Sequence, residues 1–300
     1  MSRIDLSAFN GGSGNGYIVE EHSSAIVQRV LDNSVIESMA RKENMNTTTK
    51  LVPRIFAYGD NVAKVVAEGA TINESDVYLD SIVLEARKWA SIMQISEEDL
   101  NDSFVDILNK YKTEWARQWA RNFDNACLGV NADANGTTVP YESVYRKLHN
   151  QNQGIIQSST VTFAQLNNLL SIIEQGPYFD PSKIAFIAHP SLMATLRGLV
   201  DNQNRPILVD PLGGTTPTLF GYPIKYTFGA QVSTVAGGSG HPFIMAANTD
   251  LLINGQRAGI ETQVSRDAKF DTDGVLLKVR ARRAFKCADA DGIAILEKTA

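Results

Sequence analysis

Two residues that could do chemistry, His189 and Ser191, flank Pro190 directly after the apolar run of residues 183–188. A hydrolase serine at the end of a strand needs a tight elbow with small neighbours, typically G-x-S-x-G, so that backbone N–H groups can approach the oxyanion. Those glycines are absent here. Pro190 suits the first turn of a helix, and His189 or Ser191 is a suitable cap for it. The motif therefore favours helix initiation, and a serine hydrolase that uses Ser191 is the alternative.

Residues 131–142 have part of the spacing of a calcium-binding loop. Asp133, Asn135 and Glu142 take positions three, five and twelve of an EF-hand loop. Position one, however, is Asn131 where that loop normally has aspartate, and Pro140 interrupts its short strand. Asparagine and glycine are also the residues that a turn after a long helix needs. We therefore expect a turn here and no metal site.

Three cations, Lys278, Arg280 and Arg282, alternate with apolar residues in the run LLKVRARRAF, which is typical of a half-buried strand. Cations on one face of a strand form a positive stripe that can approach DNA phosphates. Such a row is more often a solvated face that pairs with acids on a neighbouring strand, and we favour that interpretation. DNA contact at these three residues is the alternative.

Composition and charge argue against several classes of function. The chain of 300 residues has a formal net charge of −5, whereas a generic nucleic-acid binder is basic. Walker A and H-E-x-x-H spacings are absent, and the four histidines and two cysteines are scattered. No apolar run approaches the roughly 18 residues that span a bilayer. We expect no enzyme activity, no cofactor, no metal and no membrane partner, in a protein made in the cytoplasm.

The elements that must position these residues indicate a mixed α+β chain. The stretch NGGSGNG, residues 10–16, has the composition of a mobile arm, and short alternating stretches over about 50–85 predict a long two-stranded excursion. Apolar residues at steps of three and four predict a helix over about 97–128. Thr162 and Gln165 have capping-box spacing at the start of another helix. An apolar strand follows, and the last quarter of the chain is mainly strand-like.

The order of these elements resembles the major capsid protein family of tailed double-stranded-DNA phages, which has the Hong Kong 97 fold. The run VVAEGATINESDVYLDSIVLEARKWASIMQISEEDLNDS looks like the return of that family's E-loop, with a strand at 79–88, and its entry to the spine helix. IAHPSLMATLRGLVDNQNRPIL followed by LFGYPIKYT looks like its axial domain, and VRARRAFKCADADGIAILE is similar to its final strands. The resemblance implies an N-terminal arm over 1–48, an E-loop over 49–86, a peripheral domain with the spine helix over 87–154, an axial domain over 155–240, peripheral return strands over 241–285 and a last axial strand over 286–300.

The resemblance implies a virion protein that self-assembles through hexamers and pentamers into an icosahedral shell around a double-stranded DNA genome. Its partners would be other copies of itself, a separate scaffolding protein, a portal, an optional decoration protein and, through weak non-specific contacts, the packaged DNA. Neither the arm nor the E-loop is expected to bury much apolar surface within its own subunit, so both should order mainly against neighbours. An encapsulin-type shell, which encloses enzymes, is the alternative.

The resemblance further implies contacts between subunits at Arg54, Lys64, Glu68, Asp201 and Arg205. Some members seal the shell with an isopeptide bond from an E-loop lysine, for which Lys64 is the candidate donor. The sequence identifies no acceptor, so we expect no covalent sealing. Many members begin with a scaffolding segment of about a hundred residues that is removed. Here the arm begins almost at the first residue, so we expect scaffolding to be a separate protein or unnecessary.

Overall fold

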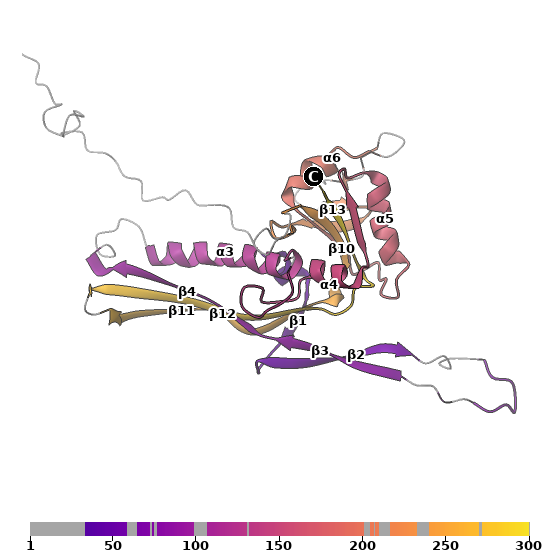
Figure 1. Ribbon diagram of the computed structural model, residues 1–300, viewed down its shortest axis with the longest axis horizontal. Helices are drawn as coiled ribbons and strands as arrows, with labels where there is room; N and C mark the ends of the chain where they lie inside the picture. Colours follow the sequence, from indigo (N-terminus) through magenta and orange to yellow (C-terminus); the bar gives the residue numbers. More distant parts are fainter. Residues whose placement is uncertain are drawn as a thin grey trace, which may run out of the picture.

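The computed structural model describes residues 34–58, 65–72, 74, 77–98, 107–130, 132–200, 205–206, 208–209, 217–232, 240–269 and 272–299. Helices and three separate sheets share the chain, and the sheets have four, seven and two strands (Figure 1). The predicted α+β class is therefore confirmed.

The four-stranded sheet is built around a long antiparallel pair, β11 and β12, in the order β1-β11-β12-β4. Its strands are β1 (Arg41–Asn44), β11 (Leu252–Lys269), β12 (Gly274–Cys287) and β4 (Arg87–Ser96). The apolar residues of LLKVRARRAF, which are Leu277, Val279 and Ala281, are buried, and the cations between them are more exposed. The predicted alternation is thus confirmed.

Helix α3 (Ile107–Leu128) lies along one face of this sheet (Figure 1). Its 22 residues correspond to a length of about 33 Å. Trp115, Trp119 and Phe123 form a stacked row, with ring centroids 6.2 and 5.2 Å apart, and Phe123 also meets the ring of Trp89 on β4. The predicted long helix is confirmed over these residues. Residues 97 and 98, at its expected start, are also helical, and residues 99–106 lie outside the described residues.

The seven-stranded sheet has the order β5-β13-β10-β6-β9-β8-β7. Its strands are β5 (Ile155–Ser158), β13 (Ile293–Lys298), β10 (Phe243–Asn248), β6 (Ile184–Ala188), β9 (Tyr222–Tyr226), β8 (Thr218–Leu219) and β7 (Leu208–Val209). Helix α5 (Phe163–Glu174) packs on it, and α4 (Val144–Gln151) precedes β5. The side chain of Thr162 accepts from the backbone N–H of Gln165, and the Gln165 side chain accepts from the Thr162 N–H, as the capping box predicts.

Strand β10 corrects the expected grouping of residues 241–285. These residues were expected to lie together in one set of return strands, but β10 pairs with β13 and β6 inside the seven-stranded sheet. All six of its residues are buried, which a strand between two neighbours and under a helix requires. The chain enters the four-stranded sheet only at Leu252, after the short 3-10 turn η3 (Thr249–Leu251).

The two-stranded sheet is a hairpin of β2 (Thr49–Tyr58) and β3 (Val77–Glu85) that projects beyond the rest of the fold (Figure 1). The predicted excursion is confirmed. The single strand expected over 79–88 is instead two strands, because the chain passes from the hairpin to β4 at Ala86. Ala86 is buried, and its N–H donates to the carbonyl oxygen of Thr48 at 2.8 Å.

Residues 34–48 correct the expected packing of the arm. Helix α1 (Val35–Met39) and strand β1 belong to the body of the fold, since β1 pairs in parallel with β11. Val35, Ile36 and Met45 are buried in the chain's own core. The prediction that residues 1–48 bury little apolar surface within their own subunit is therefore wrong for this part, and residues 1–33 lie outside the described residues.

Candidate interaction surfaces

His189 and Ser191 form the start of a helical segment. The turn η2 (Pro190–Leu192) leads directly into helix α6 (Met193–Arg197), which confirms helix initiation. His189 Nδ1 accepts from the Ser191 N–H at 3.2 Å and lies 2.8 Å from Ser191 Oγ. Burial, with the positive charge of Arg121, lowers the pKa of His189. The Ser–His contact is thus a local cap between residues two positions apart.

Asp133, Asn135 and Glu142, the EF-hand-like residues, each bind a different group of the protein. Asp133 accepts two hydrogen bonds from the Arg146 guanidinium, at 2.8 and 3.0 Å. The Asn135 side chain accepts from the N–H of Val139 within its own turn, and Glu142 pairs with Lys286 at 2.5 Å. Among the described residues, no three His, Cys, Asp or Glu side chains come together as a set of metal ligands.

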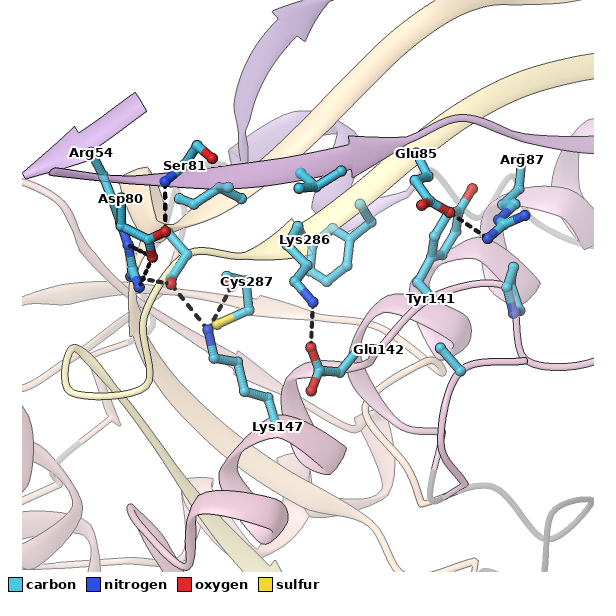
Figure 2. Close-up of a pocket in the computed structure, with 16 residues that line it drawn as sticks. Arg54, Asp80, Ser81, Glu85, Arg87, Tyr141, Glu142, Lys147, Lys286 and Cys287 are labelled. Carbon is cyan, nitrogen blue, oxygen red and sulfur yellow. Dashed lines mark hydrogen bonds and ion pairs between the residues drawn. The ribbon is translucent and has the colours of Figure 1, made fainter. Parts of the chain in front are cut away.

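The base of the hairpin is fastened to the body beside a cavity of about 480 Å³ (Figure 2). Arg54 of β2 donates from Nη1 to the carbonyl oxygen of Ala288 at 2.7 Å and to Asp289 Oδ2 at 2.9 Å, and its Nη2 pairs with Asp80 of β3. Lys147 of α4 donates to the same Ala288 carbonyl at 3.0 Å. Arg54, expected at a contact between subunits, therefore has partners within its own chain.

One face of the hairpin is apolar and exposed. Leu51 lies opposite Val83 in the strand register, and their side chains are on the same face as Leu79, with Leu51 60% and Leu79 74% exposed. The other face is buried against the body through Val52 and Ile82. An extended hairpin with this much exposed apolar surface is typical of a contact with another chain.

Of the other residues expected at contacts between subunits, the structure describes Glu68 and Arg205. Glu68 is exposed in a turn in which the N–H of Ala70 donates to the carbonyl oxygen of Ala67. Arg205 is also exposed. Lys64 and Asp201 lie outside the described residues.

The basic row of β12 lies on the sheet face turned away from α3. Arg280 pairs with Glu261 of the neighbouring strand β11 at 2.7 Å. This is the pairing expected if the row is a solvated face whose cations bind acids on the next strand. Lys278 and Arg282 have no ion pair with any acid that the structure describes. Arg282 instead lies directly opposite Lys88 of β4.

A buried carboxylate, Asp124 of α3, joins three parts of the chain and was not singled out from the sequence. It is 1% exposed and accepts from Ser34 Oγ at 2.5 Å, from the N–H groups of Val35 and Ile36, and from Thr227 Oγ1 at 2.7 Å. It therefore holds the start of α1 and the segment after β9 at the end of the long helix.

The sequence of residues 14–298 matches the phage capsid family. The chain belongs to that family. This phage capsid protein is 23% identical over 260 residues to the major capsid protein of Staphylococcus phage 80alpha, with 86% of this chain and 73% of that protein aligned. Among solved structures it is similar to a chain of Mycobacterium phage Bobi, with a TM-score of 0.73, 16% identity and 93% and 95% of the two chains covered. It is also similar to the capsid of a native GTA particle computed with C5 symmetry, with a TM-score of 0.70, 18% identity and 97% and 98% covered.

Membership of the phage capsid family identifies a shell-forming structural protein of the virion. The expectation that the chain is not an enzyme is confirmed by this family, and the serine hydrolase alternative is set aside. No helix within the described ranges has both the length and the apolar character that a bilayer crossing needs.

Proposed function

We propose that this protein is the major capsid protein of a tailed phage and builds an icosahedral shell from hexamers and pentamers around double-stranded DNA. The hairpin carries the proposal, because its outward face exposes Leu51 and Leu79 while its base is fastened to the body. Such a protruding element can lie across a neighbour, and one chain can repeat that contact around a ring. The capsid of the native GTA particle, to which the chain is similar, was computed with C5 symmetry, in keeping with a five-fold ring.

We assign the parts of the Hong Kong 97 fold on the same basis. The hairpin β2–β3 is the E-loop, α3 is the spine helix, and the four-stranded sheet with α3 is the peripheral domain. The seven-stranded sheet with α5 and α6 is the axial domain, and it includes β10 and β13. This assignment moves residues 243–248 from the peripheral to the axial domain.

Contacts to DNA are proposed to be weak and independent of sequence. The chain has a formal net charge of −5, and each phosphate that a cation neutralises would add salt-dependent affinity. A separate scaffolding protein, a portal and an optional decoration protein complete the set of proposed partners. The relatives from Staphylococcus phage 80alpha and Mycobacterium phage Bobi come from phages, which favours a genome over the enzyme cargo of an encapsulin.

Negative-stain microscopy of the recombinant protein tests this proposal. Uniform hollow shells, or rings of five and six subunits, are the expected result. A compact monomer at every concentration would contradict it. Mass spectrometry of immature particles separately tests scaffolding, because a longer precursor of this chain would show that the scaffold is not a separate protein.

A further inference from the structure

The outer edge of the four-stranded sheet is open along most of β11. Strand β1 pairs only with residues 253–256 of β11. Beyond Gln256, no strand within the described ranges lies on the side of β11 that is opposite β12 (Figure 1). An open edge presents backbone N–H and C=O groups with which an extended segment of another chain can pair. This edge is therefore a candidate surface for the addition of a strand.

The open edge of β11 lacks the residues that commonly prevent such pairing. Residues 259–265, GIETQVS, contain no proline and no lysine. Their one charged residue, Glu261, pairs within its own sheet with Arg280 at 2.7 Å. The other edge strand, β4, instead begins with Arg87 and Lys88. The register between β11 and β12 is regular over residues 261–265 and shifts on both sides of them, so the part of the edge that is suited to pairing is short.

Two exposed β-branched residues flank Thr262 on this edge. Ile260 is 44% and Val264 is 49% exposed, and Thr262 is exposed as well. Thr262 and Val264 lie opposite residues of β12 that are buried on the α3 side of the sheet. Ile260 lines a cavity together with Trp119 of α3. The three side chains therefore share the α3 face of the sheet, at an edge where a further strand would cover them.

The spacing of these residues makes the segment complementary to a second copy of itself. In an antiparallel pair with Thr262 opposite Thr262 of the second copy, Ile260 lies opposite Val264 of the second copy. Apolar β-branched residues in such cross-strand positions stabilise a sheet. Glu261 then lies opposite Gln263 of the second copy, whereas a register centred on Glu261 would oppose two carboxylates. Both the apolar pairs and the charges favour the register centred on Thr262.

A two-fold axis at Thr262 also fits the geometry of a shell. Residues directly opposite each other in an antiparallel pair point to the same side of the sheet. In this register Ile260, Thr262 and Val264, which all lie on the α3 face, are paired only with one another. Helix α3 of both copies therefore lies on the same side of the combined sheet. The subunits of a closed shell meet this condition, because all of them turn the same face inward.

We propose that residues 260–264 of β11 pair antiparallel with the same residues of a second copy, with Thr262 at the two-fold axis. The contact joins two four-stranded sheets into one and buries Ile260 and Val264 of both copies. It rests on the proposed function, because head-to-tail contacts close a ring but do not connect one ring to the next. A contact between two identical surfaces supplies that connection.

A cysteine at the axis tests this contact directly. Thr262→Cys places two thiols on Cα atoms that are about 4.5–5.5 Å apart in the proposed pair, a separation that a disulfide spans. Assembled particles of this variant are treated with oxidised glutathione, which is reduced as the disulfide forms, and are run on a non-reducing denaturing gel. Most chains are expected as covalent dimers. The native Cys127 and Cys287 are both buried and give little background.

The matched control is Gln263→Cys, at the next residue of the same exposed edge. In the proposed register its two Cα atoms are about 8 Å apart, which is too far for a disulfide. This variant should give no more dimer than the wild type. If Thr262→Cys gives no dimer, or if both variants give equal amounts, the proposed register is wrong.

Charge substitutions test whether the pairing joins rings. Ile260→Lys with Val264→Lys opposes like charges between the copies, and should lower the yield of shells about tenfold while rings persist. Ile260→Lys with Val264→Glu opposes unlike charges and should restore most of that yield. Within one subunit the two positions are about 13 Å apart along the strand, so they do not contact each other. Circular dichroism verifies that both variants are folded, and a normal yield of shells from the first would contradict the proposal.

The outcomes separate this contact from the proposed function. If the unmodified protein forms neither rings nor shells, the proposed function fails and this contact fails with it. If shells form but Thr262→Cys gives no dimer, only this contact is wrong. Hydrogen exchange of residues 257–265 in those shells then identifies the cause, because paired amides exchange slowly. Slow exchange without a dimer would mean that a different strand covers the edge, which also overturns the proposal.

Discussion

At the scale of single residues, Asp124 shows how one buried side chain sets the arrangement of distant segments. Its two oxygens accept from α1 and from Thr227, which are separated from it by about ninety residues or more in sequence. The buried donors cannot reach water, so each depends on this acceptor. We predict that Asp124→Asn lowers the free energy of unfolding by about 2–3 kcal/mol, because the amide turns an N–H group toward existing donors.

Chemical denaturation of the wild type and the variant measures this difference. Asp133→Asn is the matched control, since it makes the same chemical change at an exposed acid that binds Arg146 and Asn150. The control should change stability little. Equal effects of the two substitutions would contradict the role assigned to Asp124.

Asp124 should also make the free energy of unfolding depend on pH, with a contribution that increases as the pH falls. Burial raises the pKa of Asp124, although its hydrogen-bond donors oppose that shift. When the pKa is higher in the folded state, the group's contribution to stability is complete below the unfolded pKa and is lost as the pH rises through the folded pKa. The difference in free energy of unfolding between wild type and Asp124→Asn should therefore grow as the pH falls from 7 toward about 4. Denaturation of both proteins across this range checks the sign, and a shrinking difference would contradict it.

At the scale of elements, the hairpin is held at its base and exposed beyond it. Arg54 donates from β2 to the Ala288 carbonyl, which Lys147 also holds from α4 (Figure 2). Arg54 also binds Asp289. We predict that Arg54→Ala accelerates amide hydrogen exchange in β2 and β3 about tenfold, because the hairpin then opens at a lower free energy. Mass spectrometry of deuterated peptides measures the change.

The control for the hairpin is Arg146→Ala on α4, which also removes an arginine that binds a carboxylate, but that carboxylate is Asp133 and not a residue of β2 or β3. Exchange in the hairpin should stay at the wild-type rate. If both variants accelerate it equally, the contacts of Arg54 do not fasten the hairpin specifically.

At the scale of the whole molecule, the shell depends on surfaces that add little to the stability of one subunit. Leu79 is 74% exposed, so Leu79→Glu should change the free energy of unfolding by no more than about 0.5 kcal/mol. The same variant should prevent assembly, because a charge would be buried against a neighbour. Light scattering measures the loss of particles, and Leu79→Met, which keeps the apolar surface, should assemble. Normal shells from Leu79→Glu would show that this face of the hairpin is not covered in the particle.

The sequence by itself determined the features that depend on neighbouring residues. The alternation around Lys278 and Arg282 predicted a half-buried strand, the spacing of Trp115, Trp119 and Phe123 predicted the long helix, and Thr162 predicted the start of α5. These features follow from strand and helix periodicity and from the donors at a helix end, which operate within a few residues.

The tertiary structure alone decided which distant segments meet. It placed β10 in the seven-stranded sheet, gave Arg54 a partner at Asp289, and set Arg282 opposite Lys88, nearly two hundred residues earlier. In the sequence, Asp124 is a polar residue beside an apolar helix stripe. Only the structure shows that Ser34 and Thr227 donate hydrogen bonds to it. Such pairings depend on strand register and on the packing of whole layers, and no local pattern contains that information.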